Sequence, residues 1–222
     1  MKDIKAIRGK YYIQRLIEEG EHEHQDFKFA INDARKIARS ISAFANNDGG
    51  RLLVGVKDNG NIAGVRNEED IFVIEQAAQL YCRPPQSVEF TAFNTEGGVV
   101  IKAEVAPATN RPVCAQEPDG SWRAYYRVAD ENIVAPALMT KAWEMRQDSS
   151  GICFSLSQAE SHLLEYLDNK GSITTEEYML ATHISRHTAE ELITRLLAID
   201  ILTFIYTPSG FKITRNDSEV SL

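Results

Sequence analysis

The sequence predicts an α+β protein in which a mixed α/β domain is followed by a smaller, α-rich domain. Two observations lead to this fold class. Segments with helical and strand periodicity alternate over the first two thirds of the chain, whereas helical periodicity dominates the last third. The 222 residues, 43% of them apolar, are enough for two modest hydrophobic cores.

The elements of the first part follow from these periods. Residues 21–31 alternate between apolar and polar side chains and predict a strand with one buried face. Pro84 and Pro85 stop a helix, and Gly97 and Gly98 mark a hairpin turn. The predicted helices span 7–19, 33–46, 67–81 and 137–147, and the predicted strands span 21–31, 52–56, 62–65, 88–93, 99–105 and 122–128.

The pattern changes after residue 147. Residues 148–155 have the composition of a linker, which predicts a first domain over 1–147 and a second over 156–222. Ser157, Thr174 and Ser185 are residues that begin helices, and two short strands follow around residues 207–210. Three helices followed by a hairpin predict a winged helix-turn-helix.

Charge differs between the two parts of the chain. The whole sequence has 24 basic and 32 acidic side chains, a net charge of -8. Residues 1–150 carry 19 basic and 22 acidic side chains (net -3), and residues 151–222 carry 5 and 10 (net -5). This balance argues against a protein that coats nucleic acid through bulk positive charge, but it leaves room for a local basic patch.

The cysteines and the N-terminus predict the compartment. The three cysteines are widely spaced and form neither a CxxC pair nor a disulfide framework. Residues 1–10 lack the apolar stretch of a signal peptide, and no apolar run approaches the ~18 residues that a membrane span needs. We therefore expect a cytoplasmic protein with no membrane partner.

Carboxylates and a lysine gather at the first predicted strand. Carboxylates bind Mg²⁺ or Mn²⁺, and a lysine stabilises the charge that develops on phosphate during phosphodiester cleavage. Asp26 and Lys28 share one face of the strand, whereas Glu21 reaches that face only if a bulge or turn lies near Gly20. The alternative is a polar, solvated strand face.

A glycine-rich segment over residues 44–64 is the second candidate. It contains no GxxxxGK[ST] motif, and Gly49 and Gly50 follow a predicted helix rather than open one, so a phosphate-binding loop is not indicated. Asp58, at the end of a predicted buried strand, is either a third metal-binding carboxylate or the first residue of a turn.

These two segments resemble a known family. The runs GEHEHQDFK at residues 20–28 and ISAFANNDGGRLLVGVKDNGNIAG at residues 41–64 are similar to the motifs of the Schlafen/AlbA-type domain, and the resemblance covers roughly residues 7–135. Bacterial members are commonly described as predicted transcriptional regulators that join this domain to a C-terminal helix-turn-helix. The resemblance therefore implies DNA binding.

The same resemblance implies a metal site if the chain is a nuclease. Some animal relatives are endoribonucleases that use three acidic residues and a divalent cation. By motif position, Glu21, Asp26 and Asp58 match those acids, and Lys28 matches the family lysine; Asp26 replaces the more usual Glu. Mg²⁺ or Mn²⁺ is the only cofactor implied, and the missing phosphate-binding loop argues against ATP.

The predicted winged helix suggests a DNA-reading surface. In a DNA reader, the residues that open the second helix of the turn motif face base edges, and neighbouring cations contact phosphate. Glu190 and Glu191 oppose such contacts. The candidate base-reading residues are Arg186, His187 and Thr188, and the candidate phosphate contacts are Arg195, Lys212 and Arg215.

Three functions follow. The leading prediction is a DNA-binding transcriptional regulator that is not an enzyme. The alternative is a divalent-metal-dependent endoribonuclease that acts on structured RNA. The third is a non-catalytic module in which the winged helix mediates self-association, giving a homo-oligomer. Nucleic acid is the expected partner, with DNA favoured over RNA.

Overall fold

Two units make up the chain. The computed structural model describes residues 4–65, 69–147 and 157–216. The chain divides into two compact units between Ala135 and Pro136. The predicted division lies one helix later, and the predicted linker over 148–155 falls outside the described residues. Helices and strands occur in both units, which confirms the α+β class. None of the helices in the described ranges is long and apolar enough to cross a membrane.

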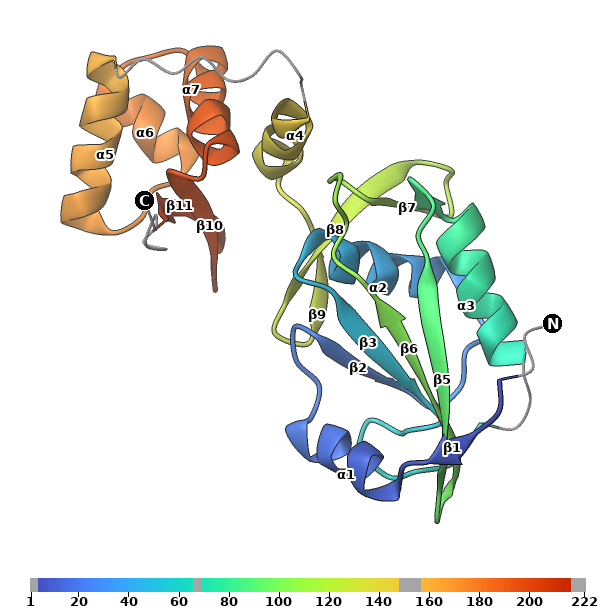
Figure 1. Ribbon diagram of the computed structural model, residues 1–222. Coiled ribbons are helices and arrows are strands. Elements are labelled where there is room, and N and C mark those ends of the chain that lie inside the picture. The colour runs from blue at the N-terminus through green and yellow to red at the C-terminus, as the bar shows by residue number, and fades with distance from the viewer. Residues whose placement is uncertain (1–3, 66–68, 148–156, 217–222) are drawn as a thin grey trace. The chain divides into compact units, whose positions relative to one another are not determined.

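A five-stranded sheet forms the centre of the first unit (Figure 1). Its strands are β1 (Ile7–Arg8), β2 (Gln25–Lys28), β3 (Gly50–Val54), β5 (Val88–Thr95) and β6 (Gly98–Val105). Their order across the sheet is β1-β5-β6-β3-β2. β2 runs parallel to β3, and β3 is antiparallel to β6. β2 is therefore an edge strand, with one side open to other groups of the chain.

Two helices, α2 (Ala34–Asn46) and α3 (Glu69–Leu80), cover one face of this sheet (Figure 1). Asp33 caps α2 by accepting hydrogen bonds from the first free N–H groups of the helix. Ile41 and Phe44 of α2 are fully buried against Leu52 of β3. This core extends to the second, smaller sheet, so α2 is buried on almost all sides.

The opposite face of the sheet is covered in part by α1 (Lys10–Glu19). Ile13 and Leu16 pack there against Phe27 and Leu53. Side chains alternate along a strand, so the neighbours of these residues on β2 and β3 face α2 instead. α1 begins three residues later than predicted because Ile7 and Arg8 form β1, which pairs with β5.

A four-stranded sheet packs on the other side of α2. Its strands are β4 (Cys82–Arg83), β7 (Cys114–Gln116), β8 (Trp122–Val128) and β9 (Glu131–Val134), in that order. Ala115 and Tyr125 belong to the same buried core as α2. The small sheet therefore holds β8 beside the helix that also supports β3.

A loop after β3 passes so close to the β5–β6 turn that two glycines nearly touch. An ideal Cβ on Gly64 would lie 3.1 Å from the Cα of Gly98, and one on Gly98 would lie 3.0 Å from the Cα of Gly64. Both have positive φ, 71° and 123°. The N–H of Val65 donates to the carbonyl of Val99 at 2.7 Å. The predicted strand here is reduced to a single bridge at Ile62.

The second unit contains four helices and a hairpin among its described residues. They are α4 (Ala137–Arg146), α5 (Gln158–Lys170), α6 (Thr175–Thr182), α7 (Arg186–Ala198), β10 (Leu202–Thr207) and β11 (Gly210–Arg215). Capping boxes at Ser157 and Thr174 begin α5 and α6. α4 packs with α5 and α7: Leu138 shares a core with Leu163 and Ile193. The helix predicted to close the first domain thus packs in the second unit.

Candidate functional site

A tight turn before β2 brings Glu21 back against the strand. The N–H of His22 donates to the carbonyl of Gln25 at 3.0 Å, and the N–H of Gln25 donates back at 3.1 Å. Glu21 Oε1 then accepts the N–H of Phe27 at 2.8 Å. On a straight strand Glu21 and Asp26 would face opposite sides, so this turn supplies the reversal that their spacing requires.

Asp26 is a buried carboxylate between two cations. Its Oδ2 lies 2.6 Å from Lys28 Nζ, and its Oδ1 lies 3.5 Å from Arg127 Nη2. Burial, followed by a hydrogen bond with Asp26, raises the pKa of Glu21, although the Phe27 N–H acts in the opposite direction. The structure therefore brings together three of the predicted residues, Glu21, Asp26 and Lys28.

Arg127 is the largest fully buried side chain of the described residues. It donates to the carbonyls of His22 at 3.3 Å and Gln25 at 3.2 Å, and to Asn132 Oδ1 at 3.0 Å. Its guanidinium lies 5.0 Å from the centre of the Phe44 ring. Arg127 thus joins β2 to the small sheet. Buried arginines are rare, and sequence reasoning did not single it out as a site residue.

Asp58 does not join this cluster. It is exposed on a turn whose Gly60 is so close to α1 that an added Cβ would lie 3.0 Å from Ile17 Cγ2. Asp26 faces the other side of the sheet, toward Arg127. Within the described ranges, no group of three or more His, Cys, Asp or Glu side chains is arranged to hold a metal ion. The three-carboxylate site expected for Mg²⁺ or Mn²⁺ is therefore not formed, and two side-chain cations already neutralise Asp26.

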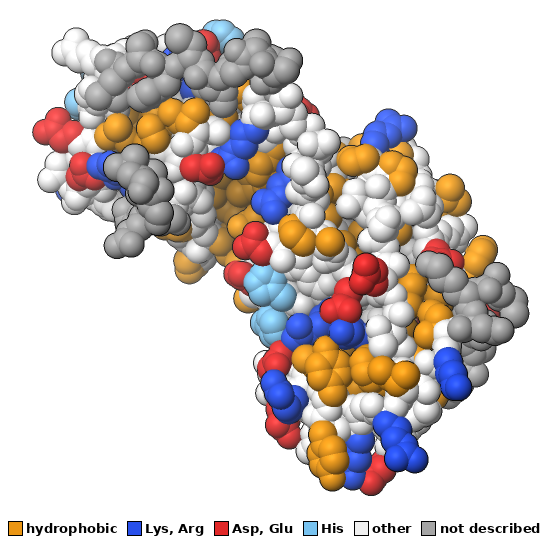
Figure 2. All heavy atoms as spheres, viewed as in Figure 1, with side chains coloured by type: hydrophobic (Ala, Val, Ile, Leu, Met, Phe, Trp, Pro, Cys, Tyr) orange, Lys and Arg blue, Asp and Glu red, His pale blue; other side chains and the backbone are white. Residues whose placement is uncertain are grey.

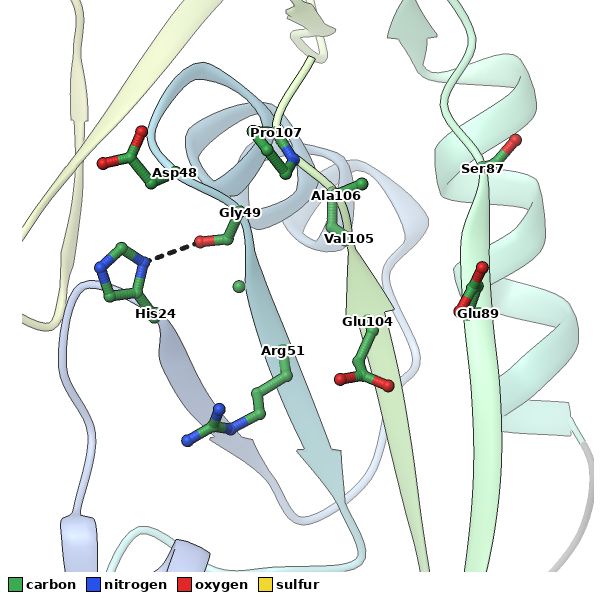
Figure 3. A pocket seen from close by; sticks show the side chains of 11 residues that line it. His24, Asp48, Gly49, Arg51, Ser87, Glu89, Glu104, Val105, Ala106 and Pro107 are labelled. Carbon is green, nitrogen blue, oxygen red and sulfur yellow. Dashed lines mark hydrogen bonds between the residues drawn. The ribbon is translucent and has the colours of Figure 1, made fainter. Parts of the chain in front are cut away.

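A hollow of about 420 Å³ lies on the α1 side of the sheet, beside the Gly49–Gly50 turn (Figure 3). His24 Nδ1 lies 2.9 Å from the Gly49 carbonyl, so the proton of a neutral ring sits on Nδ1. Arg51 donates to Gln25 Oε1 at 2.7 Å. The hollow is lined by His24, Asp48, Gly49, Gly50, Arg51, Ser87, Glu89, Glu104, Val105, Ala106 and Pro107.

The charges around this hollow are mixed. Glu104 lies opposite Arg51 on one neighbouring strand and opposite Glu89 on the other. Figure 2 likewise shows basic and acidic side chains interspersed on the visible face of the first unit. Arg51, Glu104 and Glu89 were not identified as neighbours from the sequence, because the register between separate strands, and not their spacing in the sequence, brings them together. The hollow favours neither a simple anion nor a simple cation.

The predicted base-reading residues lie at the start of α7. Ser185 caps this helix by accepting the N–H of Thr188 at 3.1 Å. Arg186 forms ion pairs with Glu176 of α6 at 2.9 Å and with Glu190 at 3.6 Å. His187 lines a shallow hollow between α4 and α7. Acidic neighbours therefore accompany the side chain that was expected to reach guanine.

Two of the three predicted phosphate contacts are also paired with carboxylates. Arg195 Nη2 lies 3.6 Å from Glu160 Oε1, and Arg215 Nη1 lies 2.6 Å from Asp168 Oδ1. Lys212 lies on β11 and forms no ion pair with a described residue. The six predicted residues occupy α7 and β11 of the same unit but do not form one basic surface.

Comparison with known proteins identifies one family. The sequence model described as "Schlafen, AlbA_2" matches residues 21–136. No curated protein matches. The solved DIP2311 protein from Corynebacterium diphtheriae is 20% identical with a TM-score of 0.44, and the match covers 85% of this chain but only 34% of that one. The N-terminal domain of a RecG-related protein from Nitrosomonas europaea is 18% identical with a TM-score of 0.38, over 59% of this chain and 97% of that domain.

Proposed function

Because the chain belongs to the Schlafen AlbA_2 family, we propose that it is a nucleic-acid-binding protein that binds DNA and regulates transcription. The family assignment covers the first unit only, so it does not say which unit contacts DNA. The second unit is the better candidate for reading duplex sequence, for the structural reason that follows.

The observation that supports DNA reading is the order α5, α6, α7, β10 and β11. A short turn joins α6 to α7, with His183 in the left-handed conformation at φ 56°. Ile173 pairs with Ile213, so a third segment joins the hairpin. This order supports the proposal of a winged helix-turn-helix, in which the start of the second helix of the turn enters the major groove. That helix is α7.

The ion pairs at α7 do not prevent this role. Arg186 is exposed, and exposed pairs contribute about 0–1 kcal/mol, so a DNA phosphate or a guanine can replace Glu176 at little cost. Glu191 and the net charge of the unit still oppose DNA. We therefore expect modest affinity that falls steeply with salt.

A duplex-binding measurement tests the proposal. Wild-type protein is titrated into a labelled pool of random duplexes at low salt, and bound sequences are selected and re-measured. Arg186→Ala is expected to weaken binding to the selected sequence about ten-fold, because one base contact is worth about 1–3 kcal/mol. Lys170→Ala, which removes an exposed charge at the far end of α5, is the matched control. Equal binding by Arg186→Ala and wild type rules out α7 as the reader.

Self-association is the alternative role for the second unit. α4 lies along α7, and Lys141 pairs with Glu190 at 3.4 Å, so part of the α7 surface is already used for helix packing. Sedimentation of the full chain over a range of concentrations measures the oligomeric state. A dimer that binds no duplex would favour an interaction module over a regulator that reads DNA.

The geometry gives less support to a metal-dependent endoribonuclease. Glu21, Asp26 and Lys28 come together, but Asp58 does not complete a three-carboxylate site. We therefore do not propose metal-dependent cleavage. Incubation with structured RNA and Mn²⁺ checks this choice: cleavage by wild type that is lost in Asp26→Asn would reverse it.

A further inference from the structure

Two arginines of the first unit lie stacked on aromatic rings near one end of the small sheet. The guanidinium of Arg83 lies 4.4 Å from the centre of the Trp122 ring, and that of Arg35 lies 4.7 Å from the centre of the Tyr81 ring. Arg83 is exposed, and the other three side chains are partly exposed. We call these four residues the arginine–aromatic patch.

The strand pairing places both pairs at the β4 edge of the small sheet. Tyr81 directly precedes β4, and its carbonyl accepts the N–H of Gln116 at 3.0 Å. Gln116 pairs in turn with Trp122 on β8. The two rings therefore stand two strands apart, which corresponds to about 10 Å in a sheet. Cys82, whose Sγ faces the Ala38 carbonyl of α2, directly precedes Arg83. Arg83 therefore reaches across β7 to Trp122 on the face of the small sheet away from α2, whereas Arg35 reaches Tyr81 from α2.

The cations of the patch lack acidic partners. Arg35 and Arg83 have no carboxylate oxygen within 4.0 Å among the described residues, and the same holds for the adjacent Lys36 and Arg123. Arg35 Nε is buried and makes no hydrogen bond within the described part. The nearby Arg39 differs, because Glu117 pairs with it. Glu117 and Asp119 act electrostatically on Arg123, so the cations without an acidic partner in the patch itself are Arg35 and Arg83.

We propose that the arginine–aromatic patch binds single-stranded nucleic acid. This inference rests on the proposed nucleic-acid function and adds a second contact surface with its own class of ligand. An arginine held over a ring loses little freedom on binding. Its outer face can stack on a base while its N–H edge donates to a phosphate.

The stacking explains the choice of a single strand over a duplex. Phosphates of a duplex need only mobile cations, and lysines serve as well as arginines. Guanidinium–aromatic pairs provide a surface for the faces of bases, and these faces are exposed only where strands are unpaired. The two pairs lie on either side of the β4 edge, so an extended strand that follows this edge can contact both with separate nucleotides.

Binding of labelled oligonucleotides to the full chain tests the inference. Oligothymidine, oligouridine and a duplex of the same length are titrated at low and moderate salt, so that DNA and RNA strands are compared directly. Arg35→Ala/Arg83→Ala is expected to weaken single-strand binding at least about ten-fold, because each lost stacking contact is worth about 1–3 kcal/mol. Arg8→Ala/Lys57→Ala removes two other exposed charges of the same unit and is the control.

A second variant separates stacking from charge. Arg83→Lys keeps the charge but loses the planar group, so we expect most of the single-strand affinity to be lost while the salt dependence is retained. Trp122 and Trp143 are the two tryptophans of the chain. In a Trp143→Phe background, an oligonucleotide that stacks on the patch should quench the fluorescence of Trp122.

The outcomes distinguish this inference from the proposed function. Single-strand binding that is lost in Arg35→Ala/Arg83→Ala and kept in the control supports the patch. Single-strand binding that is unchanged in that variant overturns the patch and leaves the proposed function standing. A wild-type chain that binds neither single strands nor duplex overturns both.

Discussion

Arg127 and Arg83 show two different uses of an arginine within the first unit. Arg127 is buried at 1% exposure and donates to two carbonyls and an amide oxygen beside Asp26. Arg83 is exposed, lies on Trp122 and has no acidic partner among the described residues. The hydrogen-bond donors of Arg127 are used within the protein, whereas those of Arg83 remain available to a ligand. An arginine whose charge is paired inside the protein stabilises the fold, whereas an exposed arginine without an acidic partner can bind a ligand.

The largest effect is expected for Arg127→Met. This change removes one of the two cations beside Asp26 and one of the two donors to each of the His22 and Gln25 carbonyls, and breaking a buried pair costs about 3–5 kcal/mol. Urea unfolding measures the loss, and Arg8→Met, an exposed arginine of the same unit, is the control. A loss below about 1 kcal/mol would remove the distinction between the two kinds of arginine.

A smaller loss, about 1–3 kcal/mol, is expected for Glu117→Gln. Burial acts to raise the pKa of Glu117, but hydrogen bonds from Arg39 and Tyr125 outweigh it and lower the pKa below 4.5. The carboxylate therefore stabilises the fold above pH 4.5, and this contribution is lost as the pH falls through the lowered value. The difference in the free energy of unfolding between variant and wild type should become smaller at acidic pH. A difference that does not change with pH would contradict this account.

Glu21→Gln should have the opposite effect and increase the stability at neutral pH. The pKa of Glu21 is raised, first by burial and then by Asp26, so wild type loses stability as the pH rises from 4.5 through the raised value. The Gln side chain still accepts the Phe27 N–H but carries no charge. We expect the variant to be more stable at neutral pH by less than about 1 kcal/mol, since Glu21 is partly exposed, and equal to wild type below pH 4.5. Thermal unfolding at both pH values checks the sign.

The smallest change in stability is expected for Arg83→Ala. The substitution uncovers one face of a ring and leaves no buried polar atom, so the free energy of unfolding should change by less than about 0.5 kcal/mol. Single-strand binding should nevertheless weaken. A variant that unfolds early would show that Arg83 supports the small sheet, and it would place Arg83 in the same class as Arg127.

Local patterns predicted much of the first unit. The alternation around Phe27 correctly indicated a strand, but β2 is shorter than predicted and is buried on both faces, as Gln25 and Asp26 show. The apolar run over residues 52–56 correctly indicated a buried strand. The short strands were missed: β1 and β4 contain two residues each, too few to show a period. Their pairing depends on partners that lie far away in the sequence.

The candidate site was predicted only in part, because the spacing of residues along the sequence does not show on which face of the sheet each side chain lies. Glu21 reaches Asp26 through a turn that the sequence required near Gly20 and that the structure places at His22–Gln25. Asp58 matches an acidic position of the family motif, but the turn that contains it lies against α1, away from Asp26. Residues 137–147 were correctly predicted as a helix, but the sequence did not indicate the partner of this helix, and the packing of Leu138 assigns it to the second unit.

The contact between Gly64 and Gly98 also restricts how this sequence can change over time. Each backbone occupies the volume that the other residue's side chain would need, and both adopt conformations that favour glycine. A substitution at either glycine is therefore expected to destabilise the fold, whichever residue occupies the other position. No single substitution can therefore compensate for another at this contact, and we expect both positions to remain glycine while other residues of the loop vary.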